Sequence, residues 1–298
     1  MSWFTEYKKS LKMAEVEEMI DLIFYRPLAF VLVKLVYNTR IKPDHLTLAA
    51  IIAGLTGGLF YAFGLQLTCY IGAFFYVLFI ILDCSDGQLA RLKKNGSSIG
   101  RLLDGIADYI VVTSIYIGIT IGYSQKEGQP SSMLLLLLIS GISIIIQEVL
   151  VDFYRTRFLD IIMKRKNTFE EGIKDYRNEY IRLKKKKGKW LEKKIIYIYL
   201  VYSKLQRNLT FRKNRVKFSN VSSEEYYKKN RVLIRFWIFM GPSAMRTTLI
   251  LCSLFNRYDI YFWITIGAFN MLAALIWIIQ RYVDKSLEST NVYAEKVA

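Results

Sequence analysis

The sequence predicts an all-α integral membrane protein with six transmembrane helices. Hydrophobic residues make up 53% of the 298 residues, which is more than a soluble domain usually contains. They are clustered in runs of about 20 residues, the length that crosses the hydrocarbon core of a bilayer. The six expected spans lie near residues 46–65, 69–89, 99–123, 133–154, 232–255 and 258–282.

Breaks in hydrophobicity and charge divide the chain into five segments. We expect residues 1–42 to form an amphipathic helical segment at the membrane interface and 43–160 to hold the first four spans. A basic insert at 161–230, the last two spans at 231–283 and a tail at 284–298 follow.

The N-terminal segment mixes acids with an apolar stripe between Glu15 and Tyr37. Helical spacing of the apolar residues predicts an amphipathic helix on the membrane surface. The same pattern also fits a helix packed against the bundle. Pro27 is expected to kink or interrupt the helix.

Positive charge is unevenly distributed along the chain. The net charge is +17, and the densest basic stretch lies between Arg155 and Arg231. This stretch would attract anionic lipid or nucleic acid, but Lys- and Arg-rich cytoplasmic loops are ordinary in membrane proteins, so we expect no nucleic-acid partner. We interpret the insert as helices lying on the bundle or at the lipid surface.

The loops also predict an orientation in the cell membrane. The connections at 64–68, 124–132 and 256–259 carry almost no basic residues, whereas those on the opposite side are rich in lysine. By the positive-inside rule, both termini and the insert are expected to face the cytoplasm.

Two familiar kinds of site are disfavoured by composition. His45 is the only histidine, and Cys69, Cys84 and Cys252 form no CxxC pair. Catalysis by a Ser-His or Cys-His pair is therefore almost excluded, unless His45 acts alone. Nothing indicates a zinc site or a disulfide framework.

Four acids in residues 81–110 carry the strongest functional signal: Asp83, Asp86, Asp104 and Asp108. Helical residues three or four apart share a face, so each pair should project together from one helix. The connection between the two helices is short, which would bring the four carboxylates to one point near the cytoplasmic side. Unpaired carboxylates are costly there, and a bound divalent cation would compensate them.

Oxygen ligands select a hard cation such as Mg²⁺, with Mn²⁺ or Ca²⁺ as alternatives, and four acids suffice for two ions. The alternative is a solvated cytoplasmic loop balanced by its basic neighbours. Asp104 and Asp108 lead directly into an apolar span, which argues against simple solvation.

Residues around the acids suit a phosphate-containing ligand. Arg91 follows Asp86 by little more than one helical turn and could bind a phosphate through paired hydrogen bonds. The small residues Gly87, Ala90 and Gly100 leave room for a base or a ribose. They are equally typical of closely packed helices.

Together these positions read D-x2-D-G-x2-A-R-x8-G-x3-D-x3-D between Asp83 and Asp108. This pattern resembles the motif of the CDP-alcohol phosphotransferase, or phosphatidyltransferase, family. The resemblance implies that Asp83, Asp86 and Asp104 hold Mg²⁺ or Mn²⁺, as two ions by expectation. Asp108 would complete the metal site and act as the general base that deprotonates the acceptor hydroxyl.

The resemblance also implies a nucleotide site. Arg91 would contact the CDP phosphates, while Gly87, Ala90 and Gly100 would line the cytidine pocket and Ser97 would add a hydrogen bond. Family members often carry Pro-Asn and a nearby Thr before the first span. Here Asp44 follows Pro43, a departure that puts a nucleotide contact at that position in doubt.

The implied activity is transfer of a phospho-alcohol group, expected to be phosphatidyl from CDP-diacylglycerol, to a hydroxyl acceptor with release of CMP in phospholipid biosynthesis. A CDP-linked small alcohol as donor, with a lipid or sugar-phosphate acceptor, fits the same motif. Arg155 and Arg246 are candidates for acceptor binding. Arg246 fits equally well as a structural partner of Glu148 or of a metal-site acid, because it lies inside an expected span.

Two other classes are less consistent with the sequence. A divalent-cation transporter should carry acids near the bilayer middle, whereas these acids lie near one surface. A membrane anchor whose insert binds a partner would leave the four acids unexplained. The small residues in the spans are compatible with a homodimer, and the sequence leaves the oligomeric state open.

Overall fold

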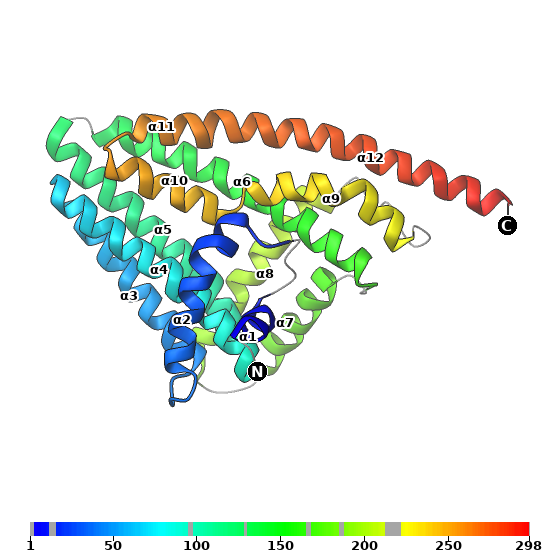
Figure 1. Ribbon diagram of the computed structural model, residues 1–298, viewed down its shortest axis with the longest axis horizontal. Helices are drawn as coiled ribbons and strands as arrows, with labels where there is room; N and C mark the ends of the chain where they lie inside the picture. Colours follow the sequence, from blue (N-terminus) through cyan, green and yellow to red (C-terminus); the bar gives the residue numbers. More distant parts are fainter. Residues whose placement is uncertain are drawn as a thin grey trace. The chain divides into compact units, whose positions relative to one another are not determined.

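The computed structural model describes residues 3–11, 16–94, 98–127, 130–164, 168–184, 188–211 and 222–297. All regular secondary structure in these residues is helical (Figure 1), which confirms the predicted class. The chain divides into two compact units, Met1–Ile144 with Pro242–Ala268 and Ile145–Gly241 with Phe269–Ala298.

In the described part of the chain, five helical stretches are long and apolar enough to cross a membrane: Pro43–Ala62, Gln66–Lys93, Ile106–Gln125, Ser131–Ile162 and Tyr258–Leu287. They correspond to the predicted first, second, third, fourth and sixth spans. The predicted fifth span falls on two shorter helices, α9 (Ser223–Phe239) and α10 (Pro242–Leu254). Pro242 explains the break because proline lacks the N–H that a continuous helix needs. The count of six spans therefore stays a prediction.

The first unit begins with α1 (Trp3–Ser10), then the π-helix η2 (Asp21–Tyr25), which runs into α2 (Arg26–Val36). The predicted N-terminal amphipathic helix is apolar on two faces. Tyr25, Phe30 and Val33 are buried, whereas Ile23 and Leu35 are 73% and 75% exposed. One face thus packs on the bundle while the other is free to contact lipid. Pro27 does not end the helix but lies where the π-helix η2 passes into α2, and the N–H that proline lacks fits this local change in hydrogen bonding.

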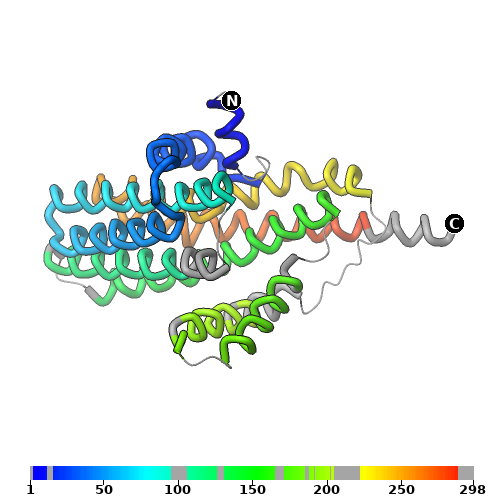
Figure 2. The backbone as a smooth tube through the Cα atoms, turned by 90° about the horizontal axis from the view of Figure 1, so that it is seen from below, coloured from blue at the N-terminus to red at the C-terminus, as the bar shows by residue number. Residues whose placement is uncertain are grey.

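The bundle of the first unit is built from α3 (Pro43–Ala62), α4 (Gln66–Lys93), α5 (Ser98–Glu127) and the beginning of α6 (Pro130–Ile162). Figures 1 and 2 show α3, α4 and α5 running side by side. Small residues permit this approach. A side chain on Gly58 would overlap Ser114 of α5, and one on Gly57 would come within 3.1 Å of the Gly72 carbonyl oxygen of α4.

The first unit is completed by α10, α11 (Tyr258–Phe262) and the π-helix η3 (Trp263–Ala268). Two buried tyrosines fix α10 in the bundle. The hydroxyl of Tyr25 lies 2.8 Å from that of Thr247, and the hydroxyl of Tyr61 lies 2.7 Å from that of Ser253. These bonds place α10 beside the N-terminal segment and α3.

The second unit holds the rest of α6, α7 (Thr168–Lys184), α8 (Trp190–Phe211), α9 and α12 (Phe269–Val297). Arg157 of α6 forms an ion pair of 2.9 Å with Asp284 of α12. The ring of Tyr154 stacks on Trp237 of α9 with centroids 4.6 Å apart. The predicted basic insert consists mainly of α7 and α8, which pack against each other (Figure 2).

Candidate active site

The motif acids lie on two helices of the first unit. Asp83 and Asp86 belong to the C-terminal half of α4, and Asp104 and Asp108 to the first part of α5. Asp86 is only 6% exposed and accepts a hydrogen bond from the Thr47 hydroxyl of α3. A buried carboxylate needs such partners, so the first turn of α3 supports the site.

Arg246 of α10 connects the two motif helices. Its Nη2 lies 2.7 Å from Oδ2 of Asp108, and its Nη1 lies 3.8 Å from Oδ2 of Asp83. The guanidinium also lies 5.5 Å from the ring centroid of Phe79, and the residue is 8% exposed. An aspartate from each motif helix thus faces one buried positive charge. The structure thus shows the structural pairing of Arg246 with two motif aspartates, and its binding of the acceptor stays a prediction.

The donor chemistry of the site suits a divalent cation. Oδ1 of Asp108 is buried and has no hydrogen-bond partner among the described residues, and carboxylate oxygens are the ligands that Mg²⁺ and Mn²⁺ prefer. No three acids, cysteines or histidines lie close enough to hold one ion in the part of the chain that the structure describes. The side chain of Asp104 lies outside that part.

The predicted nucleotide residues are partly described. Gly87 lies under the guanidinium of Arg91, since a Cβ on Gly87 would be 3.4 Å from Nη1. Nε of Arg91 donates to the Ser10 carbonyl oxygen, and Ala90 is half-buried. Gly100 lies in α5, and its surroundings, like Ser97 altogether, fall outside the described residues.

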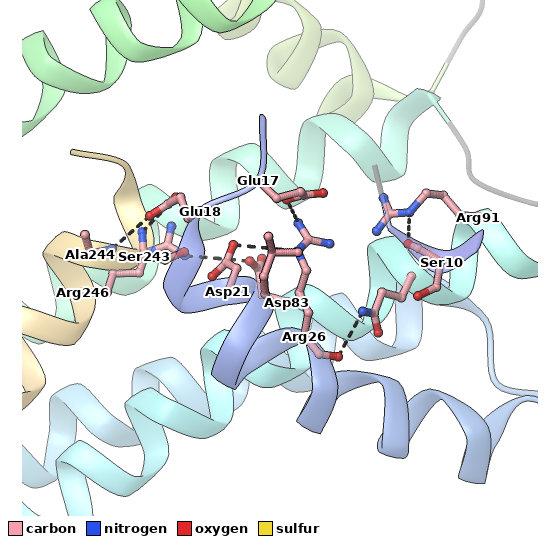
Figure 3. A network of polar contacts seen from close by, with 12 residues as sticks. Ser10, Glu17, Glu18, Asp21, Arg26, Asp83, Arg91, Ser243, Ala244 and Arg246 are labelled. Carbon is pink, nitrogen blue, oxygen red and sulfur yellow. Dashed lines mark hydrogen bonds and ion pairs between the residues drawn. The ribbon is translucent and has the colours of Figure 1, made fainter. Parts of the chain in front are cut away.

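The structure adds an acidic N-terminal segment to the site. Glu18 is 9% exposed, and its two carboxylate oxygens accept hydrogen bonds from the backbone N–H groups of Ser243 (3.3 Å) and Ala244 (3.1 Å). Figure 3 shows Glu18 directed at the first turn of α10, beside Arg246. Burial raises the pKa of Glu18 to about 8. Burial also raises the pKa of the neighbouring Asp21.

A second buried pair anchors the same segment to α4. Glu17 lies 2.6 Å from Nη2 of Arg26 (Figure 3). The Arg26 carbonyl oxygen accepts a hydrogen bond of 3.1 Å from Nε2 of Gln88 on α4. The sequence signal was available, because acids interrupt the apolar stripe of this segment. Their partners on α4 and α10 lie far along the chain, so periodicity alone could not identify them.

Arg155 has a different location from the other predicted site residues. It lies on α6 in the second unit. Its assignment to the acceptor stays a prediction from the sequence.

Residues 40–168 match the CDP-alcohol phosphatidyltransferase family. No curated protein matches the chain. The matched region contains all eight motif positions, whereas Glu18 and Arg246 lie outside it. A CDP-alcohol phosphatidyltransferase domain therefore spans residues 40–168, as the motif predicted. The match supports phosphotransfer from a CDP-alcohol to an alcohol acceptor, and the long apolar helices are those of a multi-pass membrane protein.

Proposed function

We propose that this protein transfers a phosphatidyl group from CDP-diacylglycerol to a hydroxyl acceptor in phospholipid biosynthesis, releasing CMP at the cytoplasmic face of the cell membrane. The observation that supports it best is the arrangement at Arg246. Asp83 of α4 and Asp108 of α5 face the same guanidinium, so residues distant in the motif belong to one site. Family membership of residues 40–168 supports the reaction class.

The chemistry assigned to the protein is simple. Asp108 takes the proton from the acceptor hydroxyl, and its Oδ1 has no competing hydrogen bond among the described residues. The acceptor oxygen then bonds to the phosphorus that carries the alcohol, while the bond from that phosphorus to the CMP oxygen breaks. Arg246 lies against Asp108 and holds its carboxylate in place through Oδ2.

Asp83, Asp86, Asp104 and Asp108 would hold Mg²⁺ or Mn²⁺, as two ions. When bound, the metal would supply neutralisation of the diphosphate charge and polarisation of the phosphorus under attack. Thr47 holds Asp86 by its hydrogen bond, so that carboxylate is oriented before any ligand arrives. Gly87, Ala90, Arg91, Ser97 and Gly100 are proposed to bind the CDP moiety.

The test is a CMP-release assay with the purified full chain in Mg²⁺. CDP-diacylglycerol is supplied with a panel of alcohols and phosphorylated alcohols, and CDP-linked small alcohols are supplied with lipid acceptors in parallel. We expect CMP only with CDP-diacylglycerol, and we expect EDTA to stop its release. Release only from small CDP-alcohols would reverse the donor assignment. Release from no pair would contradict the proposed activity.

A further inference from the structure

The helix α8 of the basic insert carries an exposed apolar stripe. Trp190, Tyr197, Ile198 and Val201 are 69%, 57%, 48% and 43% exposed. Their separations of seven, eight and eleven residues place them on one side of a helix with 3.6 residues per turn. Large apolar side chains gathered on one helix face indicate a contact surface.

Most of this stripe lies away from the surface that holds the insert together. Ile195 and Ile196 are 7% and 0% exposed, on the other side of α8. Tyr199 packs on Tyr176 of α7, with ring centroids 4.6 Å apart. Among the described residues of the stripe, only Tyr197 has a ring contact with α7, its centroid lying 6.3 Å from that of Tyr180. Trp190, Ile198 and Val201 stay exposed beside this packing.

Lysines accompany the stripe. Lys194 and Lys204 are exposed and fall at helical positions beside it. The exposed Lys189 precedes the helix and is paired with Glu192 at 2.9 Å. The exposed residues of α7 are different, because most are charged or polar: Glu171, Lys174, Asp175, Arg177, Asn178, Arg182 and Lys184. Ile181 is the one large apolar residue exposed among those described in α7. The exposed side of α7 thus suits contact with water. The exposed side of α8 suits contact with an apolar surface that carries negative charge.

We propose that α8 lies in the interface of an anionic phospholipid membrane. The apolar stripe then enters the boundary between headgroups and acyl chains, and the lysines reach the lipid phosphates. Trp190 and Tyr197 are the residue types that favour this depth. A second copy of the chain is a poorer occupant, because pairing two such faces would bring lysines of like charge together.

A spin label tests the depth of the stripe in the full chain. Val201→Cys on α8 and Asn178→Cys on the outward side of α7 are labelled, with the unsubstituted chain as the background control. Each is placed in bilayer nanodiscs of phosphatidylcholine with or without phosphatidylglycerol. With phosphatidylglycerol, we expect the Val201 label to lose contact with a water-soluble nickel complex and gain contact with oxygen. The Asn178 label should stay open to nickel in both.

Charge is tested by Lys189→Gln, Lys194→Gln and Lys204→Gln in one chain. These changes should return the Val201 label to nickel contact in the anionic membrane. A Val201 label open to nickel in both membranes would overturn the proposal. So would a label shielded from nickel and oxygen alike, since protein would then cover the stripe. Equal oxygen contact in both membranes would refute the requirement for anionic lipid. None of these readings depends on the enzymatic activity.

Discussion

Arg246 contacts an aspartate from each of the two helices that carry the motif. Its burial makes the pairing necessary, since a buried charge without a partner is strongly unfavourable. The same contact draws the carboxylates of Asp83 and Asp108 toward one point. Arg246 thus compensates their charge, and in the proposed mechanism it positions Asp108 for proton transfer.

Asp108→Asn tests the assignment of the general base. The amide keeps the size of the side chain but accepts no proton, so CMP release should fall by about 100-fold or more. CDP binding should persist, because Arg91 and the small residues around it are unchanged. Turnover is measured by CMP release and binding by calorimetry with CDP.

The matched control for this change is Asp175→Asn, on the exposed side of α7. This variant should turn over like the unsubstituted chain. Wild-type turnover in Asp108→Asn would instead remove Asp108 from the chemistry.

At the scale of elements, the contact between α3 and α5 depends on the absence of side chains. A Cβ on Gly58 would overlap Ser114, including 2.8 Å contacts with its backbone carbonyl. Backbone atoms cannot move aside as a flexible side chain can, so Gly58→Ala should force the helices apart. We expect a loss of about 1–3 kcal/mol in the free energy of unfolding, measured by denaturation in mild detergent.

Gly141→Ala on α6 provides the comparison for Gly58. Its added Cβ would lie 3.5 Å from the Tyr116 ring, an ordinary contact distance. Little change in stability is expected. Equal stability of the Gly58 and Gly141 variants would show that the α3–α5 approach is looser than described.

Glu18 couples the N-terminal segment to α10 through the N–H groups of Ser243 and Ala244. These donors have no partner within their own helix, and the carboxyl group of Glu18 offers one oxygen to each of them. The bond lies one turn before Arg246. Glu18 therefore fixes the helix that places the guanidinium between Asp83 and Asp108.

The raised pKa of Glu18 makes this contact sensitive to pH. Because its folded-state pKa of about 8 exceeds the ordinary 4.5, folding is favoured by proton uptake. The stabilisation that this proton uptake provides is complete at a pH below the ordinary pKa. It is lost as the pH rises through the folded-state pKa of about 8. Asp21, whose pKa is also raised, acts in the same direction, and Arg246 is the nearby opposing charge.

Glu18→Gln isolates the share of Glu18 in this dependence. The melting temperature of the unsubstituted chain should fall between about pH 5 and about pH 8, and that of Glu18→Gln should fall less. Glu224→Gln, at an exposed position of α9, should keep the full decline. Parallel declines in all three proteins would exclude Glu18 as the group responsible.

Local pattern predicted much of this architecture. Long apolar runs predicted the first four spans and the last one. The motif also predicted that Asp83 and Asp86 share one helix, α4, and that Asp104 and Asp108 share the next, α5. The role of Glu18 depends on a contact with residues more than 200 positions later, which no periodicity contains. The break between α9 and α10 had a visible cause in Gly241–Pro242, but the hydrophobic run continued across it and was interpreted as one span.

At the scale of the whole molecule, the membrane topology depends on whether α9 and α10, which are separated by the break at Pro242, cross the membrane together. The five long stretches in the described residues would by themselves leave the two ends of the chain on opposite sides. Residues 223–254 must cross as well if the basic termini and the insert are to share one side. A broken helix is tolerated at membrane depth only where its backbone groups are bonded.

Those bonds are present at the start of α10. The N–H of Gly241 donates to the Ile238 carbonyl oxygen at 2.9 Å, and the next free donors, Ser243 and Ala244, bind Glu18. We therefore expect residues 223–254 to cross once despite Pro242. Both ends of the chain would then lie on the cytoplasmic side.

Cysteine labelling measures this topology directly. Lys9→Cys, Arg257→Cys and Lys285→Cys, all at exposed positions, are treated with an impermeant maleimide in intact cells and in sealed inverted vesicles. Lys9 and Lys285 variants should react only in inverted vesicles, and the Arg257 variant only in cells. Cys69 and Cys252 are buried, and the unsubstituted chain gives the background. If the Lys9→Cys and Lys285→Cys variants were labelled from opposite sides, the chain would cross the membrane an odd number of times. That outcome would mean that α9 and α10 do not cross the membrane.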